Sequence, residues 1–302
     1  MSATTSTSAG SSRVGLDTLT TSRQVRDKVA TVVVHLAFLL ALVPLVWILG
    51  AVLAQGFTTV AKATWWTNSQ RNITPDIVGG GAYHAVIGTL EQALVCALIA
   101  VPIAMFTAVY LVEYGRGRLA RLISFMVDIL TGIPSIVAAL FVYALWVTTF
   151  GLQRVGFAVS LALVLLMIPV VVRSTEEMLK LVPNELREAS YALGVPRWKT
   201  IMRIVIPTAL GGIVTGVMLG LARVMGETAP LLILGPYAQA INPNLFSGFQ
   251  AALPTMIKDA FDNGPEGPNV ARMWAAALTL IFLVLLLNLV GRLVARTSGV
   301  KR

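Results

Sequence analysis

The chain has 302 residues, of which 56% are hydrophobic and only 12% are charged, and its formal net charge is +9 at pH 7. This composition, with a mean hydropathy of +0.80, lies outside the range of soluble globular proteins and indicates an integral membrane protein. The positive charge gives no reason to expect a nucleic-acid partner, because membrane topology accounts for the distribution of the cations.

Apolar segments long enough to cross a bilayer recur along the chain. A hydrocarbon core about 30 Å thick needs about 20 predominantly apolar residues per helix. Segments of this kind lie at 29–55, 83–112, 122–149, 156–173, 205–235 and 272–295. The sequence therefore predicts an all-α, polytopic membrane helix bundle with six transmembrane helices, which together form a membrane domain over 29–296.

The segments outside this domain are short. Residues 1–28 have a Ser- and Thr-rich start, and we expect them to form a largely disordered tail. The first span is long and lacks a small-residue cleavage site, so it is interpreted as an anchor and not as a signal peptide. Residues 297–302 form a C-terminal tail.

Lys and Arg are unequally distributed between the two sides of the predicted bundle. Cytoplasmic loops carry the excess of these residues, and assigning alternate loops to the cytoplasm places 17 of the 23 there. Both termini and the loop 174–203 are therefore predicted to be cytoplasmic. The long connection 236–271 is predicted to be extracytoplasmic.

The third predicted span contains an acid and a proline. Asp128 precedes the string Thr131-Gly132-Ile133-Pro134-Ser135. Pro134 removes a backbone donor, and the hydroxyls of Thr131 and Ser135 can satisfy the groups that it frees. We expect a broken helix here, aimed towards the bundle interior.

The loop 174–203 has the pattern of two short helices followed by a restart. Ser174 is a candidate N-cap for the first helix, and Asn184 for a second helix over 185–193. Gly194 is expected to end the second helix in a left-handed conformation, and Pro196 to begin the next element.

A narrow face of mostly small apolar residues follows the second helix of this loop. Leu186, Ser190 and Leu193 recur at helical spacing, with Ala189 and Ala192 beside them. Such a face fits a groove in another protein. It also fits lipid headgroups, with the nearby cations reaching to the membrane surface. Periodicity alone leaves both interpretations open.

The fifth predicted span contains two charges. Arg223 and Glu227 are four residues apart, which allows them to pair on one helix face, and Gly212, Gly216 and Gly220 lie near that face. Charges inside a membrane usually face protein or an aqueous path. The alternative is an ion pair that only fixes helix packing.

Patterns for catalysis and metal binding are absent from the sequence. Cys96 is the single cysteine, and His35 and His84 are too isolated for a metal cluster. No GxxxxGK[ST] phosphate loop occurs, so any ATP would be bound by another subunit. The acids within the spans form no arrangement typical of an intramembrane enzyme.

One string in the loop resembles a known docking element. Glu188-Ala189-Ser190, then Gly194, then Ile204-x-Ile206-Pro207 are similar to the EAA loop of ABC-importer permeases, in which the third residue is usually Ala and the ending is usually Leu-Pro. The resemblance implies a type I ABC-importer permease fold over 29–296. It also implies that a separate ATPase docks on this loop. The implied ATPase-coupling residues are Glu188, Ala189, Ser190, Gly194, Ile206 and Pro207.

Two further strings narrow the resemblance. Gly132-Ile-Pro-Ser-Ile-Val137 and Arg223-Val-Met-Gly-Glu-Thr-Ala-Pro-Leu231 are similar to those of the A-type permeases of the phosphate-specific transport system. This implies a prokaryotic plasma (inner) membrane protein, with no enzymatic activity or cofactor of its own, that moves inorganic phosphate through the lipid bilayer. The implied partners are a homologous C-type permease, an ATPase dimer that binds ATP and Mg, and an extracytoplasmic phosphate-binding protein. The candidate substrate-path residues are Arg223, Glu227, Thr228, Asp128, Pro134 and Ser135.

Two alternatives remain at this point. Sulfate and molybdate importers share the EAA element, so another oxyanion could be the substrate. A secondary transporter driven by an ion gradient would also have six spans and buried charges, although no inverted repeat is visible in the sequence.

Overall fold

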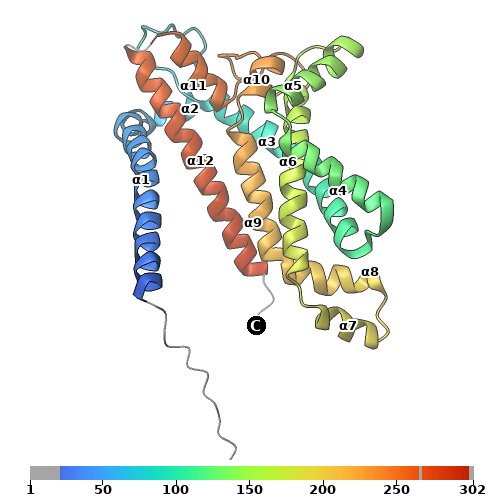
Figure 1. Ribbon diagram of the computed structural model, residues 1–302. Coiled ribbons are helices and arrows are strands. Elements are labelled where there is room, and N and C mark those ends of the chain that lie inside the picture. The colour runs from blue at the N-terminus through green and yellow to red at the C-terminus, as the bar shows by residue number, and fades with distance from the viewer. Residues whose placement is uncertain (1–20, 265–266, 299–302) are drawn as a thin grey trace, which may run out of the picture. The chain divides into compact units, whose positions relative to one another are not determined.

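The computed structural model describes residues 21–264 and 267–298, and every regular element in these ranges is helical (Figure 1). The chain divides into two units after Ala51, inside helix α1 (Thr21–Val60). The side chains of 25–50 are apolar for the most part and almost all exposed, which is typical of a helix that meets lipid. Helix α1 begins before residue 29, where the first span was expected to start. Residues 21–28, which were expected to belong to the largely disordered tail, are helical. The predicted disorder of residues 1–20 lies outside the described residues, as do residues 299–302.

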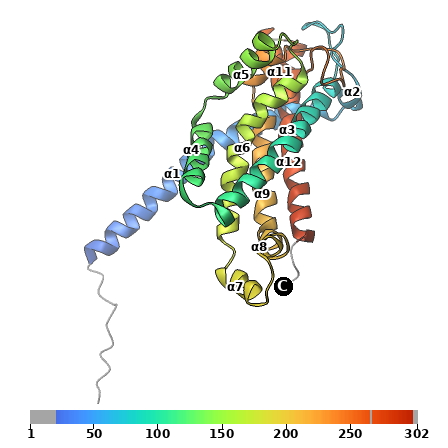
Figure 2. The same ribbon diagram turned by 90° about the vertical axis from the view of Figure 1, so that its right-hand side faces the viewer.

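Helix α6 is the centre of the second unit. It packs against α3 on one side and against α9 on another, and α9 packs in turn against α12 (Figures 1 and 2). These helices are α3 (Tyr83–Val109, continued by the π-helical turn Tyr110–Tyr114), α6 (Gly156–Lys180), α9 (Ile206–Met225) and α12 (Pro268–Ser298). On α3, Ala100, Ala104 and Ala108 are fully buried at intervals of four residues. Small residues at this spacing let two helices approach closely where lipid offers no hydrophobic driving force.

The glycine stripe of α9 faces α6. A Cβ atom at Gly216 would lie 2.2 Å from Ser174 Oγ, and one at Gly220 would lie 3.2 Å from Val171 Cγ2. The stripe is therefore turned towards protein, as expected. Arg223 lies at the edge of this face, and its side chain is 50% exposed.

The third span is broken, as predicted from its proline. Helices α4 (Gly117–Gly132) and α5 (Ser135–Tyr143, continued by the π-helical turn Ala144–Thr149) meet at an angle of 104°. Five other helices are long and apolar enough to cross a membrane, so the bent pair makes a sixth if it is one span. The predicted all-α, polytopic fold is confirmed.

The fifth span differs from the prediction. The helix ends at Met225, and a separate short helix, α10 (Ala229–Leu234), follows. The span was expected to continue to 235 because every residue after Thr228 is apolar or small. Gly226 and Pro230, which begin and interrupt this stretch, favour the break.

The connection 236–271 contains a short helix, α11 (Leu253–Asp262), at the end of the bundle opposite α7 and α8 (Figures 1 and 2). Gln250 lies just before it and is buried. Its amide nitrogen donates to Glu91 Oε2 at 2.5 Å, and its amide oxygen accepts from Gln92 Nε2 at 2.9 Å. Glu91 therefore joins α3 to this connection.

The close approach of α9 and α6 predicts a steric difference between two glycines of one helix. Gly216→Ala places a methyl group against Ser174 and should lower the stability of the purified protein by about 1–3 kcal/mol, as overpacking does. Gly211→Ala meets no atom within 4 Å and serves as the matched control. Thermal unfolding in detergent measures both, and equal melting temperatures for the two variants would contradict the packing.

Candidate functional site

The predicted docking loop is a helical hairpin, which we define as α7 (Asn184–Ala192), α8 (Arg197–Thr200) and the turn between them. Gly194 has a φ of +74° in this turn, so the predicted left-handed stop is confirmed. Pro196 immediately precedes α8, as expected. A π-helical turn (Ile201–Val205) joins α8 to α9, and together they form one long helix.

Two predicted caps of this loop are wrong. Ser174 begins no helix, because α6 continues to Lys180 and the Ser174 hydroxyl donates to the Val171 carbonyl within it. Helix α7 exists, but Pro183 is its N-cap residue and no side chain caps it. The side-chain oxygen of Asn184 accepts instead from Arg187 Nη1 at 3.2 Å.

The EAA-like residues take different positions in the hairpin. Glu188 and Ala189 are exposed, whereas Ser190 is buried and its hydroxyl lies 2.8 Å from Thr200 Oγ1. Ser190 thus holds α7 against α8 and does not lie on an exposed face. Ile206 and Pro207 are half-buried at the start of α9.

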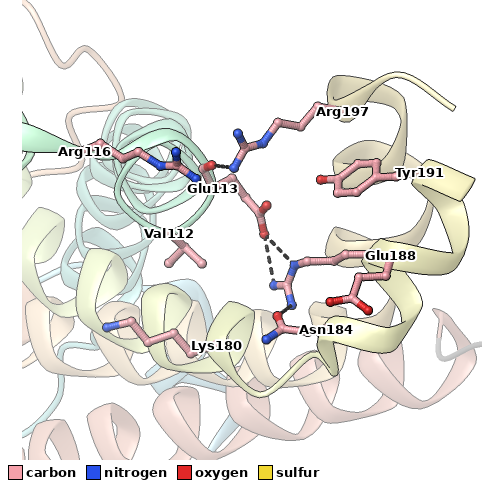
Figure 3. Close-up of a pocket in the computed structure, with 9 residues that line it drawn as sticks. Val112, Glu113, Arg116, Lys180, Asn184, Glu188, Tyr191 and Arg197 are labelled. Atoms are coloured by element: carbon pink, nitrogen blue, oxygen red, sulfur yellow. Dashed lines mark hydrogen bonds and ion pairs between the residues drawn. The ribbon is translucent and has the colours of Figure 1, made fainter. Parts of the chain in front are cut away.

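The exposed part of the hairpin is apolar. Its large exposed side chains, with those at the neighbouring helix ends, are Leu181, Leu186, Tyr191, Leu193, Trp198 and Met202. Beside them lies a charged pocket of about 450 Å³ (Figure 3). It is lined by Val112, Glu113, Arg116, Lys180, Asn184, Arg187, Glu188, Tyr191 and Arg197. An exposed apolar surface of this kind next to fixed charges is typical of a protein interaction site.

Arg223 and Glu227 form a loose ion pair. The Arg223 Nε and Glu227 Oε1 atoms are 3.7 Å apart, which is too far for a hydrogen bond. Glu227 lies beyond the end of α9, so the pair spans a helix terminus and not one helix face, as had been expected. Thr228 follows it and is half-buried at the start of α10.

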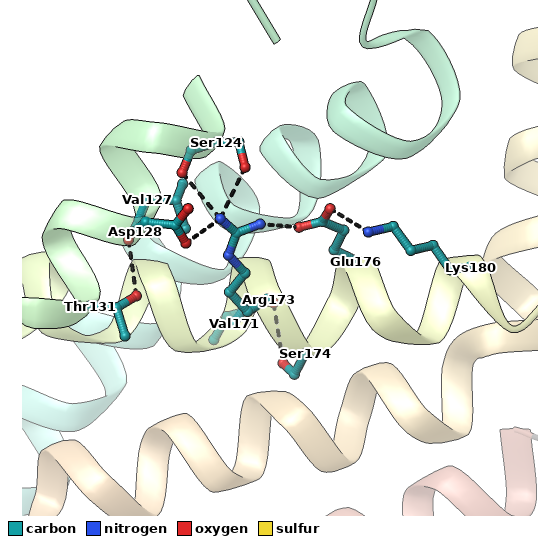
Figure 4. A network of polar contacts seen from close by, with 9 residues as sticks. All are labelled: Ser124, Val127, Asp128, Thr131, Val171, Arg173, Ser174, Glu176 and Lys180. Carbon is teal, nitrogen blue, oxygen red and sulfur yellow. Dashed lines mark hydrogen bonds and ion pairs between the residues drawn. The ribbon is translucent and has the colours of Figure 1, made fainter. Parts of the chain in front are cut away.

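Asp128 belongs to a second charged cluster (Figure 4). It accepts from Arg173 Nη2 of α6, which also donates to the backbone and side-chain oxygens of Ser124 at 3.1 and 3.0 Å. Arg173 Nη1 donates to Glu176 Oε2 at 2.7 Å, and Lys180 donates to the other oxygen of Glu176 at the same distance. This cluster ties α4 to α6.

The role of Arg173 was not predicted from the sequence, because the fourth span was expected to end at this residue and α6 continues to Lys180. The spacing of Arg173, Glu176 and Lys180 at three and four residues was the available signal for a longer helix. Pro134 is exposed at the bend between α4 and α5, and Ser135 begins α5. Within residues 21–264 and 267–298, no hydrogen bond or ion pair joins the Asp128 cluster to the Arg223 pair.

The described residues contain no group of three or more His, Cys, Asp or Glu side chains that could hold a metal ion. His84 Nε2 lies 3.0 Å from the Tyr237 hydroxyl, and Cys96 is buried against Met167. Burial raises the pKa of the Tyr237 hydroxyl, so this group is a neutral donor, and it donates to Gln70 Oε1 at 2.8 Å. The His84 contact joins α3 to the connection 236–271, and the Tyr237 bond joins that connection to the segment that contains Gln70.

The chain is similar to proteins of one transport family. The family model described as "Binding-protein-dependent transport system inner membrane component" matches residues 100–298. The phosphate transport system permease protein PstA of Mycobacterium leprae (strain TN) is 55% identical over 278 residues, which are 92% of this chain and 91% of that protein. PstA of Yersinia pestis is 37% identical over 273 residues, 90% of each chain.

Two solved structures share the fold. A chain of a bacterial alginate ABC transporter in complex with a periplasmic protein has a TM-score of 0.62 at 15% identity, covering 91% of this chain and 97% of its own. A chain of the inward-facing MetNI methionine ABC transporter has a TM-score of 0.57 at 20% identity, covering 73% and 95%. At these identities, the likeness establishes the architecture alone.

Because the members of the Asp128 cluster differ in burial, we expect their substitutions to lower the stability of the protein by different amounts. Arg173→Gln leaves the buried Glu176 with Lys180 alone and removes the bonds to α4, so stability should fall by about 1–3 kcal/mol. Asp128→Asn removes a partner whose side chain is 63% exposed, and the loss should be about 1 kcal/mol or less. Chemical unfolding of the two purified variants measures the difference, and equal losses would show that Glu176 does not need Arg173.

Proposed function

Since this chain belongs to the family of binding-protein-dependent transport system inner membrane components and, within it, to the PstA permeases, we propose that it forms part of the phosphate path of an ATP-driven importer. The observation that carries this proposal is 55% identity to a phosphate permease over 92% of the chain. The chain is a multi-pass inner-membrane permease subunit. ATP hydrolysis belongs to a separate subunit of the transporter.

An ABC importer of this family contains a second permease, an ATPase and a substrate-binding protein. Here the second permease is a homologous C-type subunit, and the ATPase is a dimer that binds ATP and Mg²⁺. The binding protein is an extracytoplasmic phosphate-binding protein. The exposed apolar side chains of the hairpin support its docking to the ATPase, with Glu188 and Ala189 on the accessible surface.

The orientation of the chain follows from its cations. With the hairpin and both termini in the cytoplasm, α11 lies at the extracytoplasmic end of the bundle, where the binding protein docks. The excess of Lys and Arg on the hairpin side supports this arrangement.

Arg223 suits the transient binding of phosphate. A partly hydrated dianion in a low-dielectric path needs a compensating cation, and the planar guanidinium matches phosphate oxygens. The Arg223 side chain is half exposed, and its only ion-pair partner among the described residues is 3.7 Å away. Phosphate can therefore displace Glu227 without breaking a short hydrogen bond, and Glu227 can restore the resting pair afterwards.

The other path residues have supporting roles in this proposal. Thr228 lies beside Glu227 at the helix break, where its hydroxyl is available to a passing oxyanion. Pro134 and Ser135 form the bend after α4, and Asp128 restrains the cation of Arg173. The sulfate and molybdate alternatives and the secondary transporter are not favoured, because the relatives are named for phosphate transport.

Substitution of Arg223 tests the proposed path in the reconstituted importer. Arg223→Ala should lower ATP-dependent uptake of labelled phosphate by about 10- to 100-fold, as expected for the loss of hydrogen bonds to a charged group. Arg223→Lys keeps the positive charge but removes the planar guanidinium, so phosphate uptake by this variant should be intermediate. The control is Arg292→Ala, which removes an exposed arginine of α12. Normal uptake by Arg223→Ala at normal assembly would refute the role of this residue.

A further inference from the structure

Glu113 is a buried carboxylate at the end of α3 that faces the hairpin. It lies in the π-helical turn Tyr110–Tyr114, and its side chain is only 3% exposed. A buried charge is strongly unfavourable unless a partner compensates it. Its partner is Arg187 of α7, whose Nη2 and Nε atoms donate to Glu113 Oε1 at 3.0 and 3.2 Å.

Arg187 also binds the end of α6. Its Nη2 donates to the Leu179 carbonyl at 2.9 Å, and its Nη1 donates to the Val182 carbonyl at 2.5 Å. These carbonyls belong to the last turn of α6 and the residues just after it, where the regular hydrogen bonds of the helix end. One guanidinium thus connects α7 to both α3 and α6.

Helix α8 is attached to the same place. Arg197 donates to the backbone carbonyl of Glu113, and its guanidinium lies 4.9 Å from the centre of the Tyr114 ring. Figure 3 shows the Arg197 side chain extending to the backbone of Glu113. Both helices of the hairpin are therefore fixed to the cytoplasmic end of α3 in the proposed orientation.

The covalent route out of the hairpin is different. The chain leaves through the π-helical turn Ile201–Val205 into α9, so the sequence alone suggests that a displacement of the hairpin would act on the fifth span. The chain enters the hairpin from α6 through residues 181–183, so the hairpin has covalent links to α6 and α9. The contact of Arg187 with Glu113 adds a non-covalent route to α3, and its bonds to the Leu179 and Val182 carbonyls strengthen the link to α6.

We propose that Glu113 and Arg187 form a latch that makes the hairpin move as one body with α3 and α6 during the transport cycle. They are positioning residues, since neither lies beside Arg223, and they act by transmitting the displacement of the hairpin. This inference rests on the proposed function of the hairpin as the ATPase docking element. The competing explanation is that the pair only stabilises the fold.

The number of phosphate ions imported per ATP hydrolysed separates these explanations. In proteoliposomes that contain the whole importer, Glu113→Gln should lower this ratio by roughly 2- to 30-fold, the range of changes to energetic coupling. The ATPase should still co-purify and hydrolyse ATP. Glu177→Gln is the matched control, because it makes the same chemical change at an exposed glutamate of α6 and should leave the ratio unchanged.

A double-mutant cycle tests whether the two residues act as one unit. Arg187→Gln should also lower the ratio, and combining it with Glu113→Gln should add little to the effect of the Arg187 change alone. An unchanged ratio in Glu113→Gln would overturn the latch. Loss of ATPase co-purification in that variant would also overturn it, because the pair would then serve assembly and not transmission.

The distance between α7 and α3 tests whether the two helices move as one body, and its measurement requires no phosphate. Spin labels at the exposed positions Ala192 of α7 and Phe106 of α3 should keep one distance in the nucleotide-free and ATP-bound importer, and Glu113→Gln should make that distance change with nucleotide. A distance that already changes in the unaltered latch would refute the proposal. Absence of phosphate import by the otherwise unaltered importer would refute the proposed function instead, while the distance result would still stand.

Discussion

The structure depends on the close packing of α6 against its neighbours. In a bilayer, lipid tails are as apolar as the side chains of the protein, so helices are held together by tight contacts and hydrogen bonds. Alanines of α3 and glycines of α9 bring both helices against α6. Gly216 leaves no space for even a methyl group beside Ser174. Such a centre has little freedom to deform internally, so movements of the bundle are expected to be displacements of whole helices.

The low-dielectric environment of a membrane also explains why the charged side chains of the helical domain are paired. Glu113 and Glu176 each have a hydrogen-bonded partner on another helix or one helical turn away. Glu91 has one in the connection that precedes α11. These contacts are short and fix the geometry. The Arg223 and Glu227 pair differs, since it is long, half exposed and placed at a helix break. A loosely held cation is of little use for stability and well suited to a site that must bind an anion and release it.

The hairpin and the proposed phosphate path at Arg223 and Glu227 are separated along the bundle. The proposed latch matters because it would transmit movement between them. The hairpin lies at one end of the bundle, opposite α11 (Figures 1 and 2), and Arg223 lies near the end of α9 that is farther from the hairpin. Work done on the hairpin by an ATPase must cross the distance between them through helices. The contacts of Arg187 with α3 and α6 provide a route through the most tightly packed part of the molecule.

Features that depend on local chemistry could be predicted from the sequence. The spans follow from apolar length, the stop at Gly194 from the left-handed turn, and the break before Ser135 from Pro134. Features that depend on partners distant in the chain could not be predicted. Arg173 is the last residue of a predicted span, and its role is not visible until Ser124 and Asp128 of α4 lie beside it. Glu113 has no visible partner until the hairpin folds back. Ser174 and Asn184 have good capping side chains, but α6 continues past the first and Arg187 occupies the second.

Substrate competition in the reconstituted importer tests whether this chain forms part of a phosphate path. This chain, its partner permease, the ATPase and the binding protein would be assembled in proteoliposomes, and ATP-dependent uptake of labelled phosphate would be measured with excess sulfate or molybdate. If this chain carries phosphate, neither competitor should reduce phosphate uptake. Uptake that sulfate or molybdate suppresses, or an assembled complex that hydrolyses ATP and moves no phosphate, would contradict it.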